Sequence, residues 1–418
     1  QGGGGNVTLV NNNSLALGNI GPVTVTPAVA MGNLSLTALS GSIYQVGTGT
    51  SLNVGGNATF LAQTSAGAPN GAVILNNLGN AFTGSVAATG TTVVIRDSTA
   101  LSLGAVTAST SLVATSGGAF TQSGAINVTG TGASAINATG TVTLSQNSTF
   151  GGNLSVISTA VGPGTTINQT GGVLSVGGNS TFTAAGGNSI SVGQANTFTG
   201  TVNFSASSGN LANVTVQDTT ALQLGALTLG AGGNLNVIAA GITQSGALVV
   251  PGTLTLQAGA GNSITLDNVA NNFATVVITS GNNVTLADAN SIILGTPSIV
   301  SGNLVLNSGI SSQTGPITVV GTTTVNAGAN AINLSNAGND FGTSVNLSNT
   351  GANAISVRDA GSLVLGNISM SSGAAGTLAI QAGGDISQLA GTTITTGTGA
   401  VQITGVNNSS VTLEIGRA

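Results

Sequence analysis

The residues best suited to chemistry in this chain are aspartates, and they recur within one phrase. Asp97-Ser-Thr-Ala-Leu-Ser-Leu-Gly104 returns with small changes at Asp218, Asp288 and Asp359, at steps of 121, 70 and 71 residues. An asparagine version begins at Asn11, 86 residues before Asp97. A carboxylate that recurs at one place in a repeat can bind calcium, or it can cap a turn of the backbone.

Calcium binding needs six to eight oxygen ligands, usually from several neighbouring carboxylates. Each aspartate of the phrase stands alone in its repeat, three or four solenoid turns from the next on our reading of the spacing. We therefore interpret these residues as Asx-type caps that accept backbone N–H groups at a corner. No metal or cofactor is expected, and the asparagine at position 11 fits the capping role.

Few other side chains in the sequence could take part in catalysis. The 418 residues include eight acidic residues and three arginines, with no lysine, histidine or cysteine. Carbohydrate cleavage needs paired carboxylates facing one groove, and Asp267 and Asp288 are about one solenoid turn apart. The sequence therefore predicts that the protein is not an enzyme, and it marks this pair as the place where that prediction would fail.

Two arginines stand directly before aspartates of the phrase, as Arg96-Asp97 and Arg358-Asp359. Neighbouring strand residues point to opposite faces, so each arginine is expected at a solvated corner, with recognition of an acidic sugar as the alternative. Three arginines cannot neutralise a run of phosphates, which excludes nucleic acid as a partner. Glycine and asparagine interrupt every apolar stretch before the ~18 residues that a membrane span needs.

Glutamines and phenylalanines recur in two further phrases. We expect the glutamines to form amide ladders inside a parallel coil, with a sugar-binding strip or an amyloid-like fibre as alternatives. The phenylalanines come one or two residues after an asparagine, or directly after an aspartate, and they are expected to stack in a thin core. The glutamines are Gln122, Gln169, Gln244 and Gln313, and the phenylalanines are Phe82, Phe198, Phe273 and Phe341.

The elements that position these residues are short strands with one apolar face, such as Asn153-Leu-Ser-Val156. Gly-Asn is frequent, whereas Asn-Gly, the strongest hairpin signal, occurs once, at Asn70-Gly71. We expect the glycine of each Gly-Asn pair to take a left-handed bend at a corner. The pattern predicts an all-β, right-handed parallel β-helix (β-solenoid) of roughly twenty turns, and an antiparallel sandwich is the alternative.

No linker divides the chain, so we expect residues 1–418 to form one continuous domain of degenerate units of about 70 residues. The phrases that mark these units end at Gly18, Gly104, Gly225, Gly295 and Gly366. The step of 121 residues is expected to carry extra turns around residues 130 to 180, where the glutamine phrase occurs twice.

The aspartate, glutamine and phenylalanine phrases together resemble those of the filamentous-haemagglutinin-like and related β-strand-repeat exoproteins that bacteria export by two-partner or autotransporter routes. The resemblance implies a secreted protein at the bacterial cell surface, with no cofactor and no catalytic residues. Its expected role is the shaft of an adhesin in attachment or biofilm, with a host-cell or matrix glycan or protein surface as partner. The alternative is a fibre or sheath protein that self-associates through the ends or sides of the solenoid.

Overall fold

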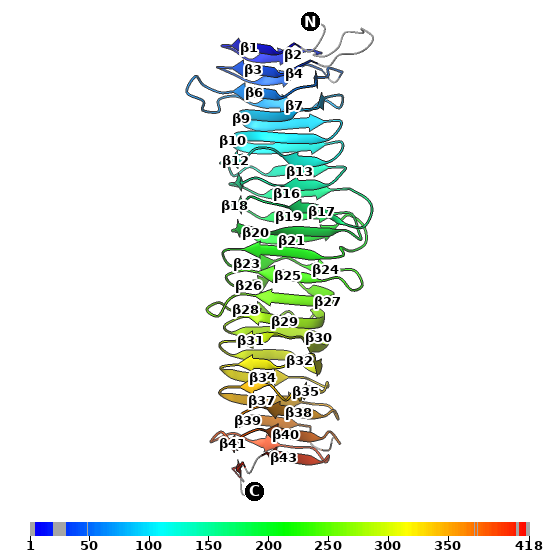
Figure 1. Cartoon of the computed structure of the whole chain (residues 1–418), viewed down its shortest axis with the longest axis vertical. Coiled ribbons are helices and arrows are strands. Elements are labelled where there is room, and N and C mark those ends of the chain that lie inside the picture. The colour runs from blue at the N-terminus through cyan, green and yellow to red at the C-terminus, as the bar shows by residue number, and fades with distance from the viewer. Residues whose placement is uncertain are drawn as a thin grey trace. The chain divides into compact units, whose positions relative to one another are not determined.

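The protein is all-β in the computed structural model, which describes residues 5–19, 31–47, 49–371, 373, 375–406 and 409–414. No helix occurs in these residues. The chain divides into two compact units, Gln1–Thr219 and Thr220–Ala418. In each unit the strands stack in parallel, turn upon turn, as a β-solenoid (Figure 1).

The strands form because apolar and small polar residues alternate. In Leu34–Ala38 and Leu154–Ser158, for example, every second residue is buried and the residues between are half-buried. The interior is filled by leucine, valine, isoleucine, alanine and phenylalanine side chains, most of them almost fully buried. Burial of these side chains is the main stabilising contribution, and the parallel pairing of strands between turns satisfies the backbone.

Unit 1 has two main faces and a narrow side. Long strands bend around a corner and contribute to more than one of them. Face one contains β1 (Val7–Asn11), β3 (Leu34–Ala38), β6 (Ala58–Ala62), the starts of β9 (Ser85–Asp97) and β10 (Leu101–Ser116), β11 (Phe120–Gln122), β14 (Val142–Leu144), β17 (Thr165–Gln169), the start of β20 (Ser189–Phe198) and β22 (Val214–Asp218). Face two contains β2 (Leu15–Leu17), β4 (Ile43–Gln45), β7 (Val73–Leu75), the ends of β9 and β10, β13 (Ser134–Ala138), β16 (Leu154–Ser158), β19 (Ser180–Ala184) and β21 (Thr201–Ala206). The narrow side contains the middle of β10, β12 (Ile126–Val128), β15 (Ser148–Phe150), β18 (Leu174–Val176) and the end of β20, while β5 (Asn53–Val54) and β8 (Ala81–Phe82) pair separately.

Unit 2 is built in the same way, and its faces are named within the unit. Its face one contains β25 (Leu235–Ile238), the ends of β27 (Leu248–Gln257), β29 (Asn272–Ser280), β30 (Val284–Leu294) and β32 (Leu304–Gln313), β35 (Ile332–Leu334), β38 (Ile355–Asp359), β40 (Leu378–Ala382) and β43 (Val401–Gly405). Its face two contains β23 (Leu222–Leu224), β26 (Ile242–Gln244), β28 (Ile264–Leu266), the starts of β30 and β32, β34 (Thr322–Asn326), β37 (Ser344–Asn349), β39 (Leu363–Met370), β41 (Ile386–Gln388) and β44 (Val411–Thr412). The sides contain β24 (Leu227–Thr228) with the starts of β27 and β29, then β31 (Ser298–Val300), β33 (Ile317–Val319) and β36 (Asp340–Phe341), and β42 (Ile394–Thr395).

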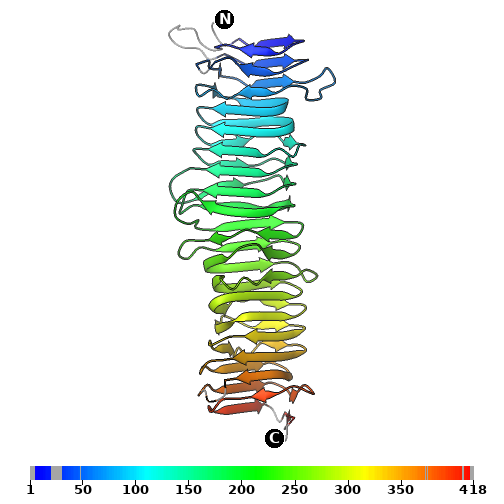
Figure 2. The ribbon, with the colours of Figure 1, turned by 180° about the vertical axis from the view of Figure 1, so that it is seen from behind.

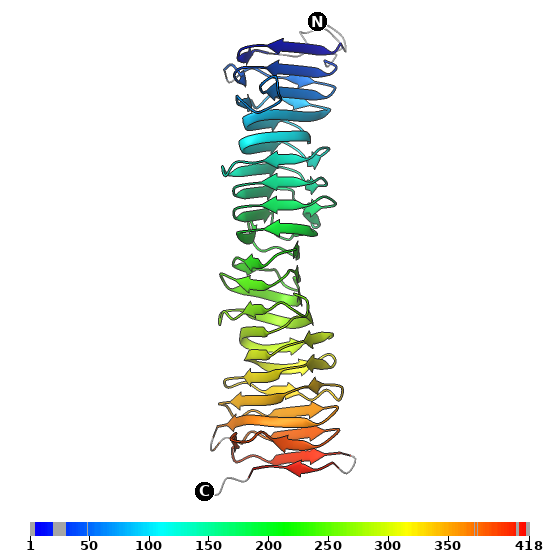
Figure 3. The ribbon, with the colours of Figure 1, turned by 90° about the vertical axis from the view of Figure 1, so that its left-hand side faces the viewer.

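The parallel solenoid predicted from the sequence is confirmed, and the antiparallel sandwich is not. Figure 3 shows the strands of one turn lying over those of the next within each unit. The described residues make about 17 turns rather than twenty. Turns are longer than expected where loops interrupt them. Ile43, for example, pairs with Val73, and the loop Thr64–Gly71 between β6 and β7 projects from unit 1 (Figure 2).

Successive copies of the repeated phrase lie at different corners of the solenoid. In unit 1, Asn11 lies where the chain leaves face one for face two, and Asp97 lies where it leaves face two for face one. Three whole turns lead from Val10 to Thr89, and Asp97 lies at the end of the next strand. In unit 2, three whole turns lead from Leu286 to Leu347, and Asp359 lies at the end of the next main-face strand. Each of these repeats therefore spans three turns and one further main-face strand.

Candidate functional site

The four aspartates of the phrase turn their carboxylates into the interior. Asp97, Asp218 and Asp359 are at most 2% exposed, and Asp288 is 8% exposed. In each case Oδ2 accepts a hydrogen bond from the backbone N–H of the phenylalanine one turn earlier. The donors are Phe82 for Asp97 (3.3 Å), Phe198 for Asp218 (3.2 Å), Phe273 for Asp288 (2.6 Å) and Phe341 for Asp359 (2.8 Å).

The second carboxylate oxygen caps the corner that follows the aspartate. Asp97 Oδ1 accepts the Thr99 N–H and the Thr99 hydroxyl, each at 2.9 Å. Asp288 Oδ1 accepts the N–H of Asn290 at 2.8 Å, and Asp359 Oδ1 accepts that of Gly361 at 2.6 Å. These are the i to i+2 contacts of an Asx turn. The same carboxylate thus closes its own corner and holds the turn before it.

Asn11 occupies the equivalent place but makes a different contact. Its side chain is half-buried, and Nδ2 donates to the carbonyl oxygen of Ser14 at 3.3 Å. It lies in the first described strand, so no earlier described turn supplies a phenylalanine N–H. This position caps a corner without linking two turns.

Burial raises the pKa of the carboxyls of Asp97, Asp288 and Asp359. The backbone N–H groups that bond each carboxylate oppose this by lowering the pKa, and they do not cancel it. The charge of Asp340 raises the pKa of Asp359 further. Within the described residues, no group of three or more histidine, cysteine, aspartate or glutamate side chains could hold a metal ion.

The predicted glutamines mostly form pairs with asparagines of the next turn. Gln169 and Asn196 exchange two hydrogen bonds, from Nε2 to Oδ1 at 2.7 Å and from Nδ2 to Oε1 at 2.9 Å. The pair Gln244 and Asn271 does the same at 2.8 and 2.9 Å, and Gln313 and Asn339 at 2.9 and 3.2 Å. The amides therefore form reciprocal pairs, not the continuous ladder that we expected.

The asparagine of each pair is fully buried and has further partners. Asn339 Oδ1 also accepts the Ile317 N–H at 3.0 Å, and its Nδ2 donates to the carbonyl oxygens of Leu334 and Arg358. The sequence analysis missed that the glutamines are partnered by the asparagines two residues before Phe198, Phe273 and Phe341. The separation in sequence is nearly constant in three pairs, at 26 or 27 residues, and this spacing was the available signal.

A fourth pair, Gln45 and Asn80, was not predicted. Its two hydrogen bonds measure 2.7 and 3.0 Å, and Asn80 Oδ1 also accepts the Leu52 N–H at 3.0 Å. The pair spans 35 residues because the loop between β6 and β7 lengthens that turn. Gln122 differs from the other glutamines, since it donates to the Ser148 hydroxyl at 2.8 Å and accepts the Ser145 N–H at 3.1 Å.

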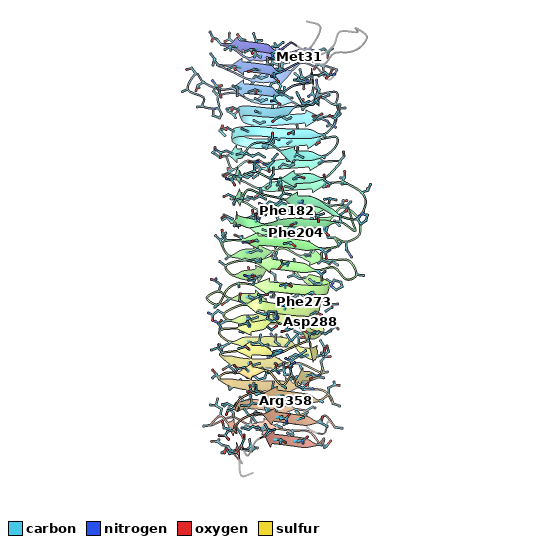
Figure 4. All side chains as sticks on the ribbon, viewed as in Figure 1. Met31, Phe182, Phe204, Phe273, Asp288 and Arg358 are labelled. Atoms are coloured by element: carbon cyan, nitrogen blue, oxygen red, sulfur yellow. The ribbon has the colours of Figure 1, made fainter. Side chains whose placement is uncertain are left out.

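The four predicted phenylalanines lie in the core and are at most 2% exposed. They are Phe82, Phe198, Phe273 and Phe341. The Phe60 and Phe82 rings meet edge to face with centroids 6.1 Å apart, and those of Phe182 and Phe198 at 6.2 Å. The rings of Phe182 and Phe204 are stacked at 5.6 Å (Figure 4). The three phrases thus meet in one buried arrangement: a glutamine, the asparagine of Asn-x-Phe one turn later, and the aspartate one turn after that.

The Gly-Asn corners form a separate, exposed series of hydrogen bonds. Asn33 N–H donates to Asn6 Oδ1 at 2.9 Å, and Asn57 N–H donates to Asn33 Oδ1 at 2.8 Å. The left-handed bend that we expected occurs at Gly187 and Gly209, which precede asparagines and have φ of 78° and 64°. It does not occur at Gly56, Gly178 and Gly302. Glycine is needed because a Cβ would collide with the asparagine of the preceding turn. That asparagine is Asn33 beneath Gly56.

The two carboxylates that the sequence marked as a possible catalytic pair do not face one groove. Asp267 is exposed, whereas Asp288 is buried with both oxygens bonded to backbone N–H groups. Arg96 and Arg358 are half-buried and point outward from β9 and β38. Arg358 borders a surface hollow of about 230 Å³ in unit 2.

A family described as repeats of unknown function (DUF5649) matches residues 4–89, 90–157, 146–205, 211–280, 281–348 and 352–415. The chain belongs to this family. The second and third DUF5649 matches overlap at residues 146–157, within the long step between Asp97 and Asp218. No curated protein and no solved structure matches the chain. The described part of these DUF5649 repeats contains no helix that is long and apolar enough to cross a membrane.

Proposed function

We propose that this chain is a non-catalytic, extracellular structural protein, the shaft of a bacterial surface adhesin involved in attachment or biofilm. The resemblance of its phrases to filamentous-haemagglutinin-like exoproteins supports a secreted, surface-attached role. A solenoid paired from turn to turn is suited to this role, because its backbone offers few unpaired segments to proteases.

One observation carries the proposal: the polar residues that recur in the sequence are used to join successive turns. The carboxylates of Asp97, Asp288 and Asp359 each bond backbone N–H groups in two places. The asparagines of the amide pairs are fully buried. Repetition in this chain therefore supports register and stiffness, which are the properties that a shaft needs.

A second candidate, a fibre that grows through end-to-end or lateral contacts, is favoured by exposed apolar side chains in unit 2. Leu389, Val401 and Val411 are 48%, 50% and 43% exposed, and Val401 borders an opening of about 560 Å³ with Ile403 and Leu413. Exposed apolar side chains that lie close together can be covered by a second molecule.

Electron microscopy of the purified chain at high concentration separates the two candidates. Uniform single particles support the shaft, and filaments longer than one molecule support the fibre. In the second case Val401→Lys is expected to abolish the filaments, because it places a charge in the junction. Val305→Lys, an outward change on an internal turn, serves as the control. Failure of the chain to appear on the cell surface when its cells are fractionated would overturn the extracellular role.

A further inference from the structure

The Arg358 side chain lies outward on β38, between the inward side chains of Val357 and Asp359 (Figure 4). No hydrogen bond or ion pair joins its guanidinium group to another described residue. Its backbone carbonyl oxygen, by contrast, is held by Asn339 Nδ2 at 3.2 Å. The strand is thus fixed from inside, while the cation itself remains available at the surface.

Two rows of outward side chains cross the surface beside this arginine. In the first row, Arg358 is paired with Gln381, which is paired with Thr404 on the next turn. In the second row, Ser356 is paired with Ala379, which is paired with Gln402. Successive turns are ~4.8 Å apart, so these groups form a small lattice of hydroxyl and amide groups with one cation.

The hollow exists because the middle of the second row is small. It has a volume of about 230 Å³ and is lined by the polar groups of both rows and by Ser335. Ala379 lies between Ser356 and Gln402, and its methyl side chain leaves space that a longer side chain would fill. The space is smaller than a pocket for a drug-sized ligand and suits one small polar ring.

We propose that this hollow binds a carboxylated sugar unit of an acidic polysaccharide, with Arg358 as the residue that binds the carboxylate. The planar guanidinium can donate two parallel hydrogen bonds to a carboxylate. The hydroxyl and amide groups of Ser356, Gln381, Gln402 and Thr404 each donate and accept, as the vicinal hydroxyls of a sugar ring require.

An acidic peptide fits the hollow less well than a sugar. A peptide carboxylate would satisfy Arg358, but it would leave the surrounding hydroxyl and amide groups without partners that both donate and accept. The rows follow the stacking direction of the turns, so a polysaccharide chain can continue along them from one turn to the next. The proposal does not depend on the chain being an adhesin shaft, because the hollow belongs to unit 2 itself.

The test is titration of the whole chain with polygalacturonate, followed by isothermal calorimetry at low salt. Arg358→Gln is expected to weaken binding at least about tenfold, because it removes a charge-assisted bidentate contact. Arg358→Lys should retain part of the binding as a point charge. Ala379→Leu should also prevent binding by filling the hollow. Far-ultraviolet circular dichroism of each variant should be unchanged, since the altered side chains point outward.

Arg96→Gln is the matched control, because Arg96 also precedes an inward aspartate and points outward. It is expected to leave polygalacturonate binding unchanged. Equal losses in Arg96→Gln and Arg358→Gln, or no loss in Arg358→Gln, would overturn the proposal. Binding of poly-glutamate as tight as that of polygalacturonate would also overturn it, since the sugar hydroxyls would then contribute nothing. Dextran, which has no carboxylate, should not bind.

Discussion

Arg96-Asp97 in unit 1 and Arg358-Asp359 in unit 2 are the same dipeptide in the same phrase. The inward aspartates make the same contacts in both units, whereas the outward arginines do not have the same neighbours. Both aspartates accept the N–H of a phenylalanine one turn earlier and an N–H two residues later. The arginines have different neighbours. Beside Arg96 the adjacent outward row contains Val94, Val113 and Ala135.

Beside Arg358, the corresponding row contains Ser356, Ala379 and Gln402, and a hollow lies there. The branched side chains of the unit 1 row occupy the space that Ala379 leaves open in unit 2. The comparison teaches that the repeated phrase determines what lies inside the solenoid. What the surface can bind depends on single outward residues, one turn above or below, that the phrase does not constrain.

The largest expected effect comes from removing the buried asparagine side chains that lie beneath the repeated phrase in both units. Asn80→Ala and Asn339→Ala each remove a buried amide and leave its glutamine and backbone partners without hydrogen bonds. We expect each to cost about 3 kcal/mol of local stability. Hydrogen exchange of the Leu52 and Ile317 amides, which donate to these asparagines, measures the loss.

Asn76→Ala is the control for these variants, because Asn76 is exposed and follows β7. It should change exchange at Leu52 by an amount close to the error. A loss confined to one of the two units would show that the buried arrangements are not equivalent.

The second prediction concerns protonation of the same inward residues. The carboxyls of Asp97 and Asp359 should titrate above the ordinary aspartate value of 3.8, because burial raises the pKa of each. The exposed carboxyl of Asp385 should titrate below it, because the Ser410 N–H stabilises the ionised form. Carbon-13 detected NMR of the carboxyl groups measures all three.

These pKa shifts determine how the stability of the folded state changes with pH. A carboxyl whose pKa is raised on folding favours the folded state below its unfolded pKa, and this contribution is lost as the pH rises through the folded pKa. Acidification toward 3.8 should therefore stabilise the turns that contain Asp97 and Asp359. Asp340→Asn should lower the pKa of Asp359 and leave that of Asp97 unchanged. A shift at both sites would contradict this assignment of causes.

The smallest effect is expected when the outward neighbours of Arg358 in unit 2 are copied beside Arg96 in unit 1. This experiment tests whether those neighbours distinguish the two arginines. Val94→Ser with Val113→Ala gives Arg96 the small and polar neighbours that Arg358 has. The variant should gain a weak second site for polygalacturonate in calorimetry, and adding Arg96→Gln should remove it. Absence of the second site would mean that neighbour size is not what distinguishes the two arginines.

The sequence was sufficient to predict the fold class. Alternating strands such as Leu154–Ser158 and the excess of Gly-Asn over Asn-Gly indicate a parallel solenoid, and both are local features. The reason for glycine at Gly56 could not be predicted, because it lies in a contact with Asn33 of the turn below. Such contacts depend on which residues are stacked.

The buried site was predicted only in part for the same reason. The aspartates, glutamines and phenylalanines were recognised, but the pairing of Gln45 with Asn80 depends on a loop that lengthens one turn. Pairing residues across turns requires the length of every turn, and these lengths vary. The hollow beside Arg358 rests on the stacking of Ser356, Ala379 and Gln402, which are far apart in sequence and carry no shared pattern.

Each repeat ends one main-face strand beyond a whole number of turns. From Val10 to Thr89 the chain makes three whole turns, and from Arg96 to Ser205 it makes five. Whole turns can be inserted without changing the side on which later residues appear. Loss or gain of one complete repeat moves every later residue of that unit to a different face. A surface site such as that of Arg358 could therefore change sides through a change in repeat number alone, without substitution of any residue that forms it.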